Sequence, residues 1–292
     1  MEREVDILIS SRDRHSELAL LIQSLRTQTF QNWNLYILDN ASGTPLINSH
    51  FISVLINRLK LEGHKVKILR NNIDFGICYA RNLLNKLQLE QGTGNFSMRL
   101  DDDVILQPDY IEKLFEVINS GYDIASGIIP LMAYPEIKRE VRVLGDEINK
   151  VIIDNEGNLT YFGDDCGYSY IENKIISAGH FRSSALYKSE INKITYPDNL
   201  SKYGFREESF FSLKTKALGY KIGIHTGAIA YHIQTQSGGG RQYSTIEAIQ
   251  QDDLTFVKWI KKKYLQGEFK WKDNLLNGLK QDYQINHGVQ NV

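Results

Sequence analysis

The sequence predicts an α/β protein, with a mainly parallel sheet flanked by helices and a helical extension at the C-terminal end. In the first 127 residues, short apolar and β-branched runs alternate with segments whose apolar residues recur at helical spacing. Each of these apolar runs ends in a polar or charged segment. Strands that alternate with helices need crossover connections, which favour parallel pairing and a sheet covered on both faces.

Composition narrows the class of protein. The chain has 292 residues, with 34 basic and 35 acidic side chains and a net charge of -1, so nucleic acid is not expected as a partner. Two cysteines, Cys78 and Cys166, are too few for a structural zinc site or a disulfide framework, which favours a reduced setting. The first residues show no leader pattern, and no uncharged apolar run approaches the ~20 residues of a membrane span. We therefore expect a cytoplasmic protein, with peripheral contact at the inner membrane face left open.

Four strands are predicted in the first half, over residues 5–10, 33–38, 66–69 and 96–100, and helical patterns follow the first, third and fourth. A polar tip follows each strand. In open parallel sheets, ligands bind beyond the carboxyl ends of the strands, so these tips should converge on one crevice. The residues concerned are Ser11 and Arg12, Asp39, Asn72 and Gly76, and Asp101 to Asp103.

The run Asp101-Asp102-Asp103 follows the apolar strand of residues 96–100 directly. Three neighbouring carboxylates repel one another, and this arrangement gains nothing for the fold unless a cation or strong donors lie between them. A hard divalent ion, Mg²⁺ or Mn²⁺, is the economical partner, because it binds one or two carboxylates together with substrate phosphates. The alternative is a solvated acidic turn before a helix N-terminus. No glycine-rich phosphate loop is present, so a metal would have to carry the charge of any bound phosphates.

The order and spacing of four segments resemble the GT-A-fold glycosyltransferases of family 2. The segments are Ser10-Ser11-Arg12-Asp13-Arg14, Asp39-Asn40-Ala41-Ser42, Asn72-Ile73-Asp74-Phe75-Gly76-Ile77-Cys78-Tyr79-Ala80-Arg81-Asn82, and Leu100-Asp101-Asp102-Asp103. The resemblance covers about residues 4–235 and is strongest up to residue 127. It implies a GT-A-like, Rossmann-type fold, a nucleotide-sugar donor that is commonly a UDP-sugar, and Mn²⁺ or Mg²⁺ held through a DxD element.

The resemblance also implies roles for individual residues of the first half. Asp39 matches the acid that contacts the nucleotide base, Asp101 and Asp102 match the part facing the ribose and sugar, and Asp103 matches the metal ligand. With three Asp in a row, the division between Asp102 and Asp103 stays open. An Asx turn at Asp39 and a solvated helix charge at Arg81 are the structural alternatives to donor binding. The expected donor-binding residues are Ser11, Arg12, Asp39, Asn72, Gly76, Arg81, Asp101, Asp102 and Arg241.

The second half offers a base, a histidine and a glycine-rich segment. The pair Glu207-Glu208 resembles the family's Glu-Asp element at the start of a helix, and Glu208 is our first choice for the base that takes the acceptor proton, with Glu207 second. Helix N-terminal charge is the structural alternative for this pair. His232 ends an apolar strand and matches a residue that completes the metal shell in many members of the fold. Three glycines before Arg241 predict either a lid that brings Arg241 onto a diphosphate or a flexible linker.

These observations predict a GT-A-like domain over residues 1–245, with a nucleotide-sugar-binding half (1–127) and an acceptor-binding half (128–245), and a helical extension over 246–292. The extension could bind an anionic lipid surface or pack on the catalytic domain. The function implied is metal-dependent, inverting transfer of a sugar to a hydroxyl of a glycan or glycolipid acceptor, in polysaccharide, glycolipid or glycoprotein glycan synthesis. The alternatives are a metal-dependent nucleotidyltransferase and a catalytically idle nucleotide-sugar-binding module.

Overall fold

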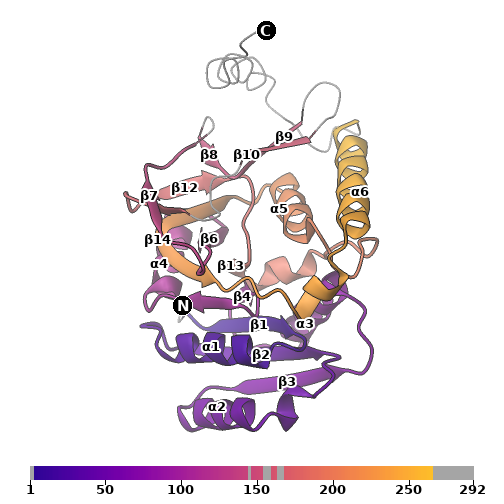
Figure 1. Cartoon of the computed structure of the whole chain (residues 1–292). Coiled ribbons are helices and arrows are strands. Elements are labelled where there is room, and N and C mark those ends of the chain that lie inside the picture. Colours follow the sequence, from indigo (N-terminus) through magenta and orange to yellow (C-terminus); the bar gives the residue numbers. More distant parts are fainter. Residues whose placement is uncertain (1–2, 144–145, 154–158, 163–167, 266–292) are drawn as a thin grey trace.

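A computed structural model describes residues 3–143, 146–153, 159–162 and 168–265, and a sheet of ten strands lies at its centre (Figure 1). The strands of this sheet are β1 (Val5–Ser11), β2 (Trp33–Asn40), β3 (Val66–Asn71), β4 (Phe96–Leu100), β5 (Val104–Leu106), β6 (Ile124–Ile128), β8 (Glu147–Ile148), β12 (Ile175–Ala178), β13 (Ser184–Lys188) and β14 (Ile222–His232). Neighbours follow the order β3-β2-β1-β4-β13-β6-β14-β12-β8, and β5 pairs with β14. Two small sheets join β9 (Lys150–Ile153) to β10 (Leu159–Phe162) and β7 (Ile137–Arg139) to β11 (Tyr168–Tyr170).

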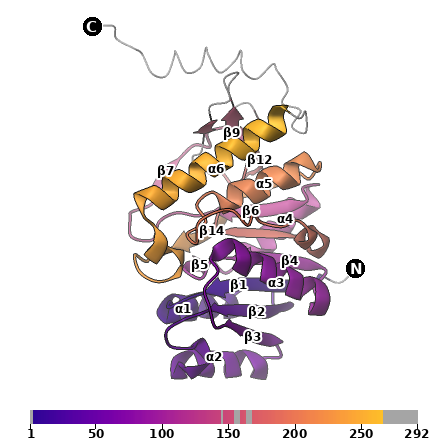
Figure 2. The ribbon, with the colours of Figure 1, turned by 90° about the vertical axis from the view of Figure 1, so that its right-hand side faces the viewer.

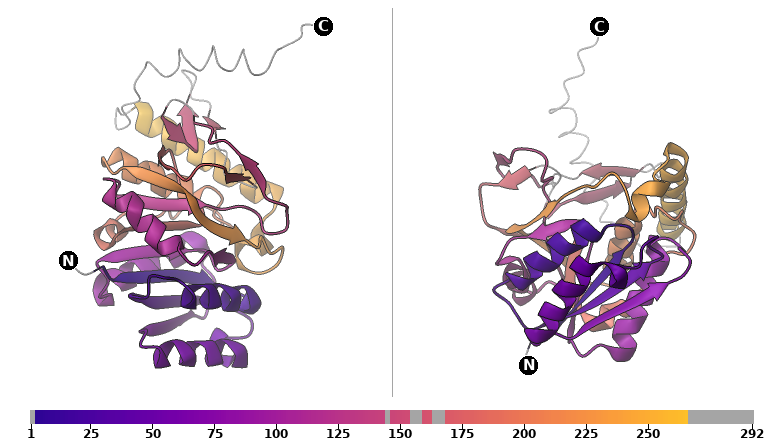
Figure 3. Two further views of the ribbon diagram at one scale, coloured as in Figure 1. Left: turned by 90° about the vertical axis from the view of Figure 1, so that its left-hand side faces the viewer. Right: turned by 60° about the horizontal axis from the view of Figure 1, so that its bottom comes forward.

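Helices cover both faces of the large sheet. They are α1 (His15–Arg26), α2 (His50–Leu61), α3 (Ile77–Gln91), α4 (Tyr110–Asn119), α5 (Glu207–Ala217) and α6 (Ile246–Leu265). Because strand side chains alternate between faces, Ile7 and Ile9 of β1 join a core with α1, α2 and α4, whereas Leu8 packs against α3 on the other face. Burial on both faces explains why β1 and β2 read as nearly continuous apolar runs. Figure 3 shows the strands as one layer between these helices.

The pairing places the polar tips of the first half at one edge. Strand β1 pairs in parallel with both β2 and β4, and β2 pairs in parallel with β3. Strand β13 then inserts antiparallel between β4 and β6, and β14 runs parallel to β6. The predicted α/β class with a mainly parallel, helix-flanked sheet is therefore confirmed. Strand β13 was not predicted, because a five-residue segment without its own crossover helix carries no alternating pattern.

The C-terminal extension begins with α6, which lies across α5 (Figure 2). Phe256 and Ile260 of α6 pack against Phe210 and Leu213 of α5 in a separate apolar cluster. The predicted helix is therefore present over Ile246–Leu265, and the rest of the extension, 266–292, lies outside the described residues. Within the part of the chain that is described, no helix combines the length and apolar character needed to cross a membrane.

Candidate active site

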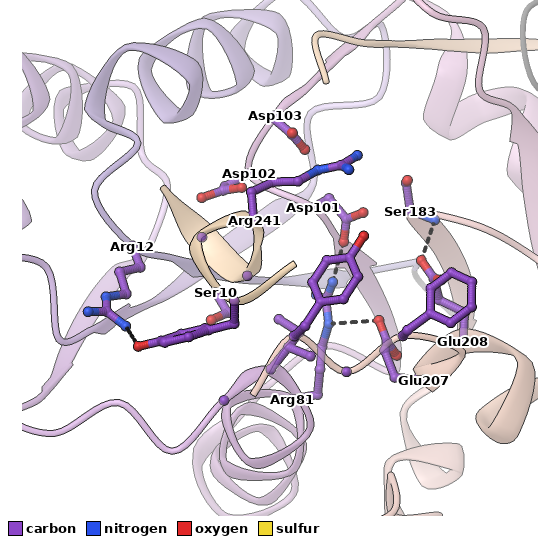
Figure 4. A pocket seen from close by; sticks show the side chains of 18 of the residues that line it. Ser10, Arg12, Arg81, Asp101, Asp102, Asp103, Ser183, Glu207, Glu208 and Arg241 are labelled. Atoms are coloured by element: carbon purple, nitrogen blue, oxygen red, sulfur yellow. Dashed lines mark hydrogen bonds and ion pairs between the residues drawn. The ribbon is translucent and has the colours of Figure 1, made fainter. Parts of the chain in front are cut away.

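One cavity of about 490 Å³ opens at the carboxyl ends of β1 and β4 and extends to the start of α5 (Figure 4). Eleven of the thirteen residues expected in the site line it. They are Ser11, Arg12, Gly76, Arg81, Asp101, Asp102, Asp103, Glu207, Glu208, His232 and Arg241. The fold thus brings together residues of β1, α3, the segment after β4, α5, β14 and the segment after β14. This convergence follows from parallel pairing, which puts successive strand ends on the same edge.

Asp39 and Asn72 are the two expected residues that do not line this cavity. The Asp39 carboxylate is buried and accepts hydrogen bonds from the backbone N–H groups of Ser42 (2.9 Å) and Leu46 (3.0 Å) and from Arg70 (2.5 Å). It therefore shapes the turn after β2, as the Asx alternative describes. Asn72 is exposed after β3, and the neighbouring Asp74 lines the cavity in its place.

Each carboxylate of the acidic triplet contacts an arginine. Asp101 pairs with Arg81 of α3 and, at 3.3 Å, with Arg99 of β4. Although desolvation raises the pKa of Asp101, these two arginines lower it to about 2. Asp102 and Asp103 share one Nη of Arg14, each at 2.9 Å. Desolvation nevertheless raises the pKa of Asp102 to about 6, with Arg14 opposing and Asp103 adding to the rise.

Two neighbouring glutamates at the start of α5 have different surroundings. Glu207 is buried and accepts two hydrogen bonds from the guanidinium of Arg99, at 3.0 and 3.1 Å. Glu208 lines the cavity, accepts a hydrogen bond from the backbone N–H of Ser183 (3.0 Å) and lies 3.3 Å from Arg99. Desolvation, reinforced by the charge of Glu207 and opposed by Arg99, raises the pKa of Glu208 to about 7. Of the two, Glu208 is the carboxylate placed to accept a proton near neutral pH.

The model of glycosyl transferase family 2 matches residues 6–174, more than half of the chain. The chain belongs to this family. An uncharacterized glycosyltransferase of Haemophilus influenzae is 26% identical over 120 residues, which are 41% of this chain and 36% of that protein. The recognition of family 2 from the sequence motifs is thereby confirmed.

Solved structures of S. aureus TarS have the same fold. The TarS 1–349 complex with UDP-GlcNAc has a TM-score of 0.54 and 14% identity, and the match covers 83% of this chain and 62% of that one. The complex with UDP has a TM-score of 0.52 and 14% identity, covering 78% and 60%. The family 2 chain described here thus spans about a third of its Haemophilus relative and about three fifths of TarS 1–349.

Members of family 2 typically depend on a divalent metal, and two groups in this chain fit one. The imidazole Nε2 of His232 lies 3.3 Å from the Asp103 carboxylate, and Oδ2 of Asp102 is buried without a hydrogen-bond partner among the described residues. The described part of the chain holds no group of three or more His, Cys, Asp or Glu side chains arranged for a metal. A carboxylate and an imidazole fit an ion that receives its other ligands from a diphosphate, and the imidazole suits Mn²⁺ better than Mg²⁺.

Arg14 connects Asp102 and Asp103 to the segment after β14. Its Nε donates to the carbonyl of Ser237 (3.1 Å) and its Nη2 to the carbonyl of Thr235 (3.3 Å), while Nη1 bridges Asp102 and Asp103. Gly238 has φ +72° and no room for a Cβ, which would lie 2.7 Å from the Arg14 side chain. The glycines after β14 therefore let the backbone close over Arg14.

Two arginines that line the cavity, Arg12 and Arg241, differ in whether they pair with a carboxylate. Arg12 is paired with Asp74 and donates to the hydroxyl of Tyr243, which lies in the short helix η3 (Gly239–Tyr243). Arg241, also in η3, has no carboxylate partner among the described residues and lies in the cavity with the acidic triplet (Figure 4). Arg241 is therefore the arginine placed to meet an anionic ligand.

Sequence reasoning missed the wall formed by residues 202–206. This loop precedes Glu207, and the buried carboxylate of Asp252 in α6 holds it by accepting hydrogen bonds from Ser201 (2.6 and 2.7 Å) and from the N–H of Phe205 (2.8 Å). Gly76, at φ +91°, packs so closely that a Cβ would lie 2.8 Å from the backbone of Lys202. No sequence pattern connects residue 252 with residue 205, because the contact arises from helix packing.

Proposed function

We propose that this protein transfers a sugar, with inversion, from a UDP-sugar to an acceptor hydroxyl with the help of a divalent metal. One observation supports this most: a single cavity holds a carboxylate with a pKa of about 7, Glu208, and an Asp103–His232 pair that fits a metal. The first group can accept a proton, and the second can hold a diphosphate through a cation. Metal-assisted transfer of a sugar to a hydroxyl uses both groups.

The donor is proposed to bind against the ends of β1 and β4. The TarS complexes with UDP and UDP-GlcNAc support a uridine nucleotide, because that protein has the same fold. Ser11, Arg12, Gly76, Arg81, Asp101 and Asp102 line this part of the cavity and are the proposed donor-binding residues. Asp39 and Asn72 stay proposed donor contacts that this cavity does not support, since Asp39 holds the turn after β2 and Asn72 is exposed after β3.

The leaving diphosphate is stabilised by positive charge on one side of the cavity. Bound Mn²⁺ or Mg²⁺, held by Asp103 and His232, would supply charge that offsets the charge developing on the diphosphate. Arg241 adds a second positive charge and a fork of N–H donors suited to phosphate oxygens. As the bond between the anomeric carbon and the phosphate oxygen breaks, its electron pair leaves with UDP.

Glu208 acts on the other side of the cavity. Its carboxylate takes the proton of the acceptor hydroxyl while that oxygen forms the bond to the anomeric carbon. Attack from the face opposite the diphosphate inverts the configuration. Glu207 cannot share this role without losing Arg99, because both of its oxygens are bonded to that guanidinium.

The acceptor is proposed to be a glycan or glycolipid hydroxyl, bound by the half of the domain from residue 128 to 245. Synthesis of a polysaccharide, a glycolipid or a glycoprotein glycan would use this chemistry. Cytoplasmic localisation, with or without contact at the inner membrane face, stays a prediction.

A nucleotidyltransferase would need a basic clamp for a triphosphate, but Arg12 and Arg14 are already paired with Asp74 and with Asp102 and Asp103. The reaction products separate the possibilities. The protein is incubated with a panel of UDP-sugars and acceptors, with and without Mn²⁺, and the release of UDP and of pyrophosphate is measured. Metal-dependent release of UDP supports sugar transfer. Pyrophosphate release, or metal-dependent binding without turnover, would contradict it.

A further inference from the structure

Arg99 is a fully buried arginine that does not line the cavity, yet it touches three of the site's carboxylates. It lies on β4 with 1% of its side chain exposed. Its guanidinium is bonded twice to Glu207 and lies 3.3 Å from both Asp101 and Glu208. Burying a charged group is costly unless it is paired and hydrogen-bonded, so a side chain in this position is held by its partners.

Aromatic packing fixes the guanidinium in place. Its Cζ lies 5.5 Å from the ring centre of Phe181 and 5.7 Å from that of Tyr196, and the Tyr196 hydroxyl is 3.2 Å from Nη1. Although burial lowers the pKa of Arg99, its carboxylate partners keep it well above the ordinary value, so the group stays charged. A fixed positive charge therefore stands behind Glu208.

The charges around Glu208 do not balance. Among the described residues, the ion pairs of this group join two cations, Arg81 and Arg99, to three carboxylates, Asp101, Glu207 and Glu208. Both oxygens of Glu207 accept hydrogen bonds from Arg99, and Asp101 contacts both Arg81 and Arg99. Glu208 has only the 3.3 Å contact with Arg99 among these pairs. Of the three carboxylates, which all line the cavity, Glu208 therefore has the least compensated negative charge.

We propose that Arg99 is a positioning residue that sets the proton affinity of Glu208 through its shared contacts with Glu207 and Glu208. The inference rests on the proposed function, in which Glu208 is the base. Arg99 does not line the cavity, so its effect reaches the reaction through the carboxylates that it contacts, Glu207 and Glu208 and, on the donor side, Asp101. Its positive charge favours the ionised form of Glu208, whereas Glu207 opposes that form.

This arrangement predicts opposite pH shifts for two neutral replacements. In the wild type, transfer rises with pH through about 7 as Glu208 loses its proton. Arg99→Gln removes the attraction, so the pKa of Glu208 rises and the acidic limb of the kcat profile moves up by about one pH unit. Well below that limb, kcat falls about tenfold for a shift of one unit. Glu207→Gln removes the negative charge that repels ionised Glu208 and frees Arg99 to interact with Glu208. The pKa of Glu208 therefore falls, and the acidic limb of the kcat profile moves to lower pH.

The experiment measures kcat and donor KM from pH 5 to 9 for these variants, with Arg99→Lys as the charge-preserving replacement. Arg26→Gln is the matched control, because this side chain at the end of α1 contacts Glu62 and Gln23 and does not line the cavity. Opposite shifts with donor KM changed less than about twofold, and a limb near its wild-type position in Arg99→Lys, support the proposal. The proposal would be overturned if the acidic limbs of the kcat profiles coincide in all variants, or if kcat falls by the same factor at every pH.

A second readout does not depend on turnover. Carbon-13 NMR of protein labelled at the glutamate side-chain carboxyls gives the pKa of Glu208, assigned with Glu208→Gln. Should Arg99→Gln not fold, Tyr196→Phe removes one hydrogen bond to the guanidinium and gives a smaller upward shift of the same sign. If wild-type protein transfers no sugar while the NMR shifts appear, the proposed function fails and the electrostatic link stands. If transfer occurs and the shifts do not, the link fails alone.

Discussion

The cavity contains two groups of neighbouring carboxylates, and arginines neutralise them in different ways. In the acidic triplet after β4 each carboxylate touches an arginine, with Arg14 between Asp102 and Asp103. At the start of α5, Arg99 is bonded twice to Glu207 and makes one longer contact, of 3.3 Å, with Glu208. The triplet is thus paired with arginines throughout and is the proposed place of a metal, whereas the glutamate pair leaves one carboxylate, Glu208, with a pKa of about 7. Neighbouring carboxylates that cannot be distinguished in the sequence thus differ in pKa and in binding partners, because arginines contact them at different distances.

The largest effect should come from removing the under-neutralised glutamate. Glu208→Gln should lower kcat by about 10²- to 10⁴-fold, as for loss of a general base, while UDP binding measured by calorimetry changes little. Glu90→Gln, an exposed residue near Lys86 on α3, is the control. A kcat of Glu208→Gln within tenfold of the wild-type value would contradict the role of Glu208 as the general base.

The next effect concerns the acidic triplet. Asp103→Asn should weaken Mn²⁺-supported UDP binding on the order of 10²-fold, because loss of supporting groups around a metal alone costs 10- to 100-fold. Asp109→Asn, which loses only an exposed ion pair with Lys113, should bind normally. Calorimetry with and without Mn²⁺ measures both. Unchanged Mn²⁺-dependent binding in Asp103→Asn would refute the ligand role.

Arg241 tests whether the unpaired arginine serves the diphosphate. Arg241→Gln should weaken UDP binding by about 10- to 100-fold, since a hydrogen bond to a charged group contributes about 1.5–3 kcal/mol. Uridine, which lacks phosphates, should bind wild type and variant equally. Arg58→Gln changes an exposed arginine of α2 and is the control. Equal losses for UDP and uridine would show that Arg241 supports the loop rather than the phosphates.

The smallest effect concerns the arginine between Asp102 and Asp103. Arg14 and a metal would compete for the same Asp103 oxygen, so Arg14→Gln should tighten Mn²⁺ binding to the nucleotide-free protein several-fold. Electron paramagnetic resonance of free Mn²⁺ measures this affinity directly. Weaker Mn²⁺ binding in the variant would mean that Arg14 holds Asp102 and Asp103 in place for the metal and does not compete with it.

The sequence predicted the first four strands and the helices after the first, third and fourth of them, but it missed α2. The apolar runs of β1, β2 and β4 are buried almost throughout, and each of these strands ends in a polar tip. The sequence also predicted eleven residues that line the cavity. It could not predict the places of Asp39 and Asn72, since a turn-capping and a ligand-binding Asp have the same local pattern. Nor could it predict Arg99 or Asp252, whose contacts join residues 108 and 47 positions apart.

The most direct test of the account is anomalous diffraction from a crystal of the protein with Mn²⁺ and UDP. The account predicts a manganese peak beside Asp103 and His232, shared with the diphosphate, with Arg241 on the phosphates and Glu208 open to the side where an acceptor would lie. A peak elsewhere, or UDP bound outside this cavity, would contradict it.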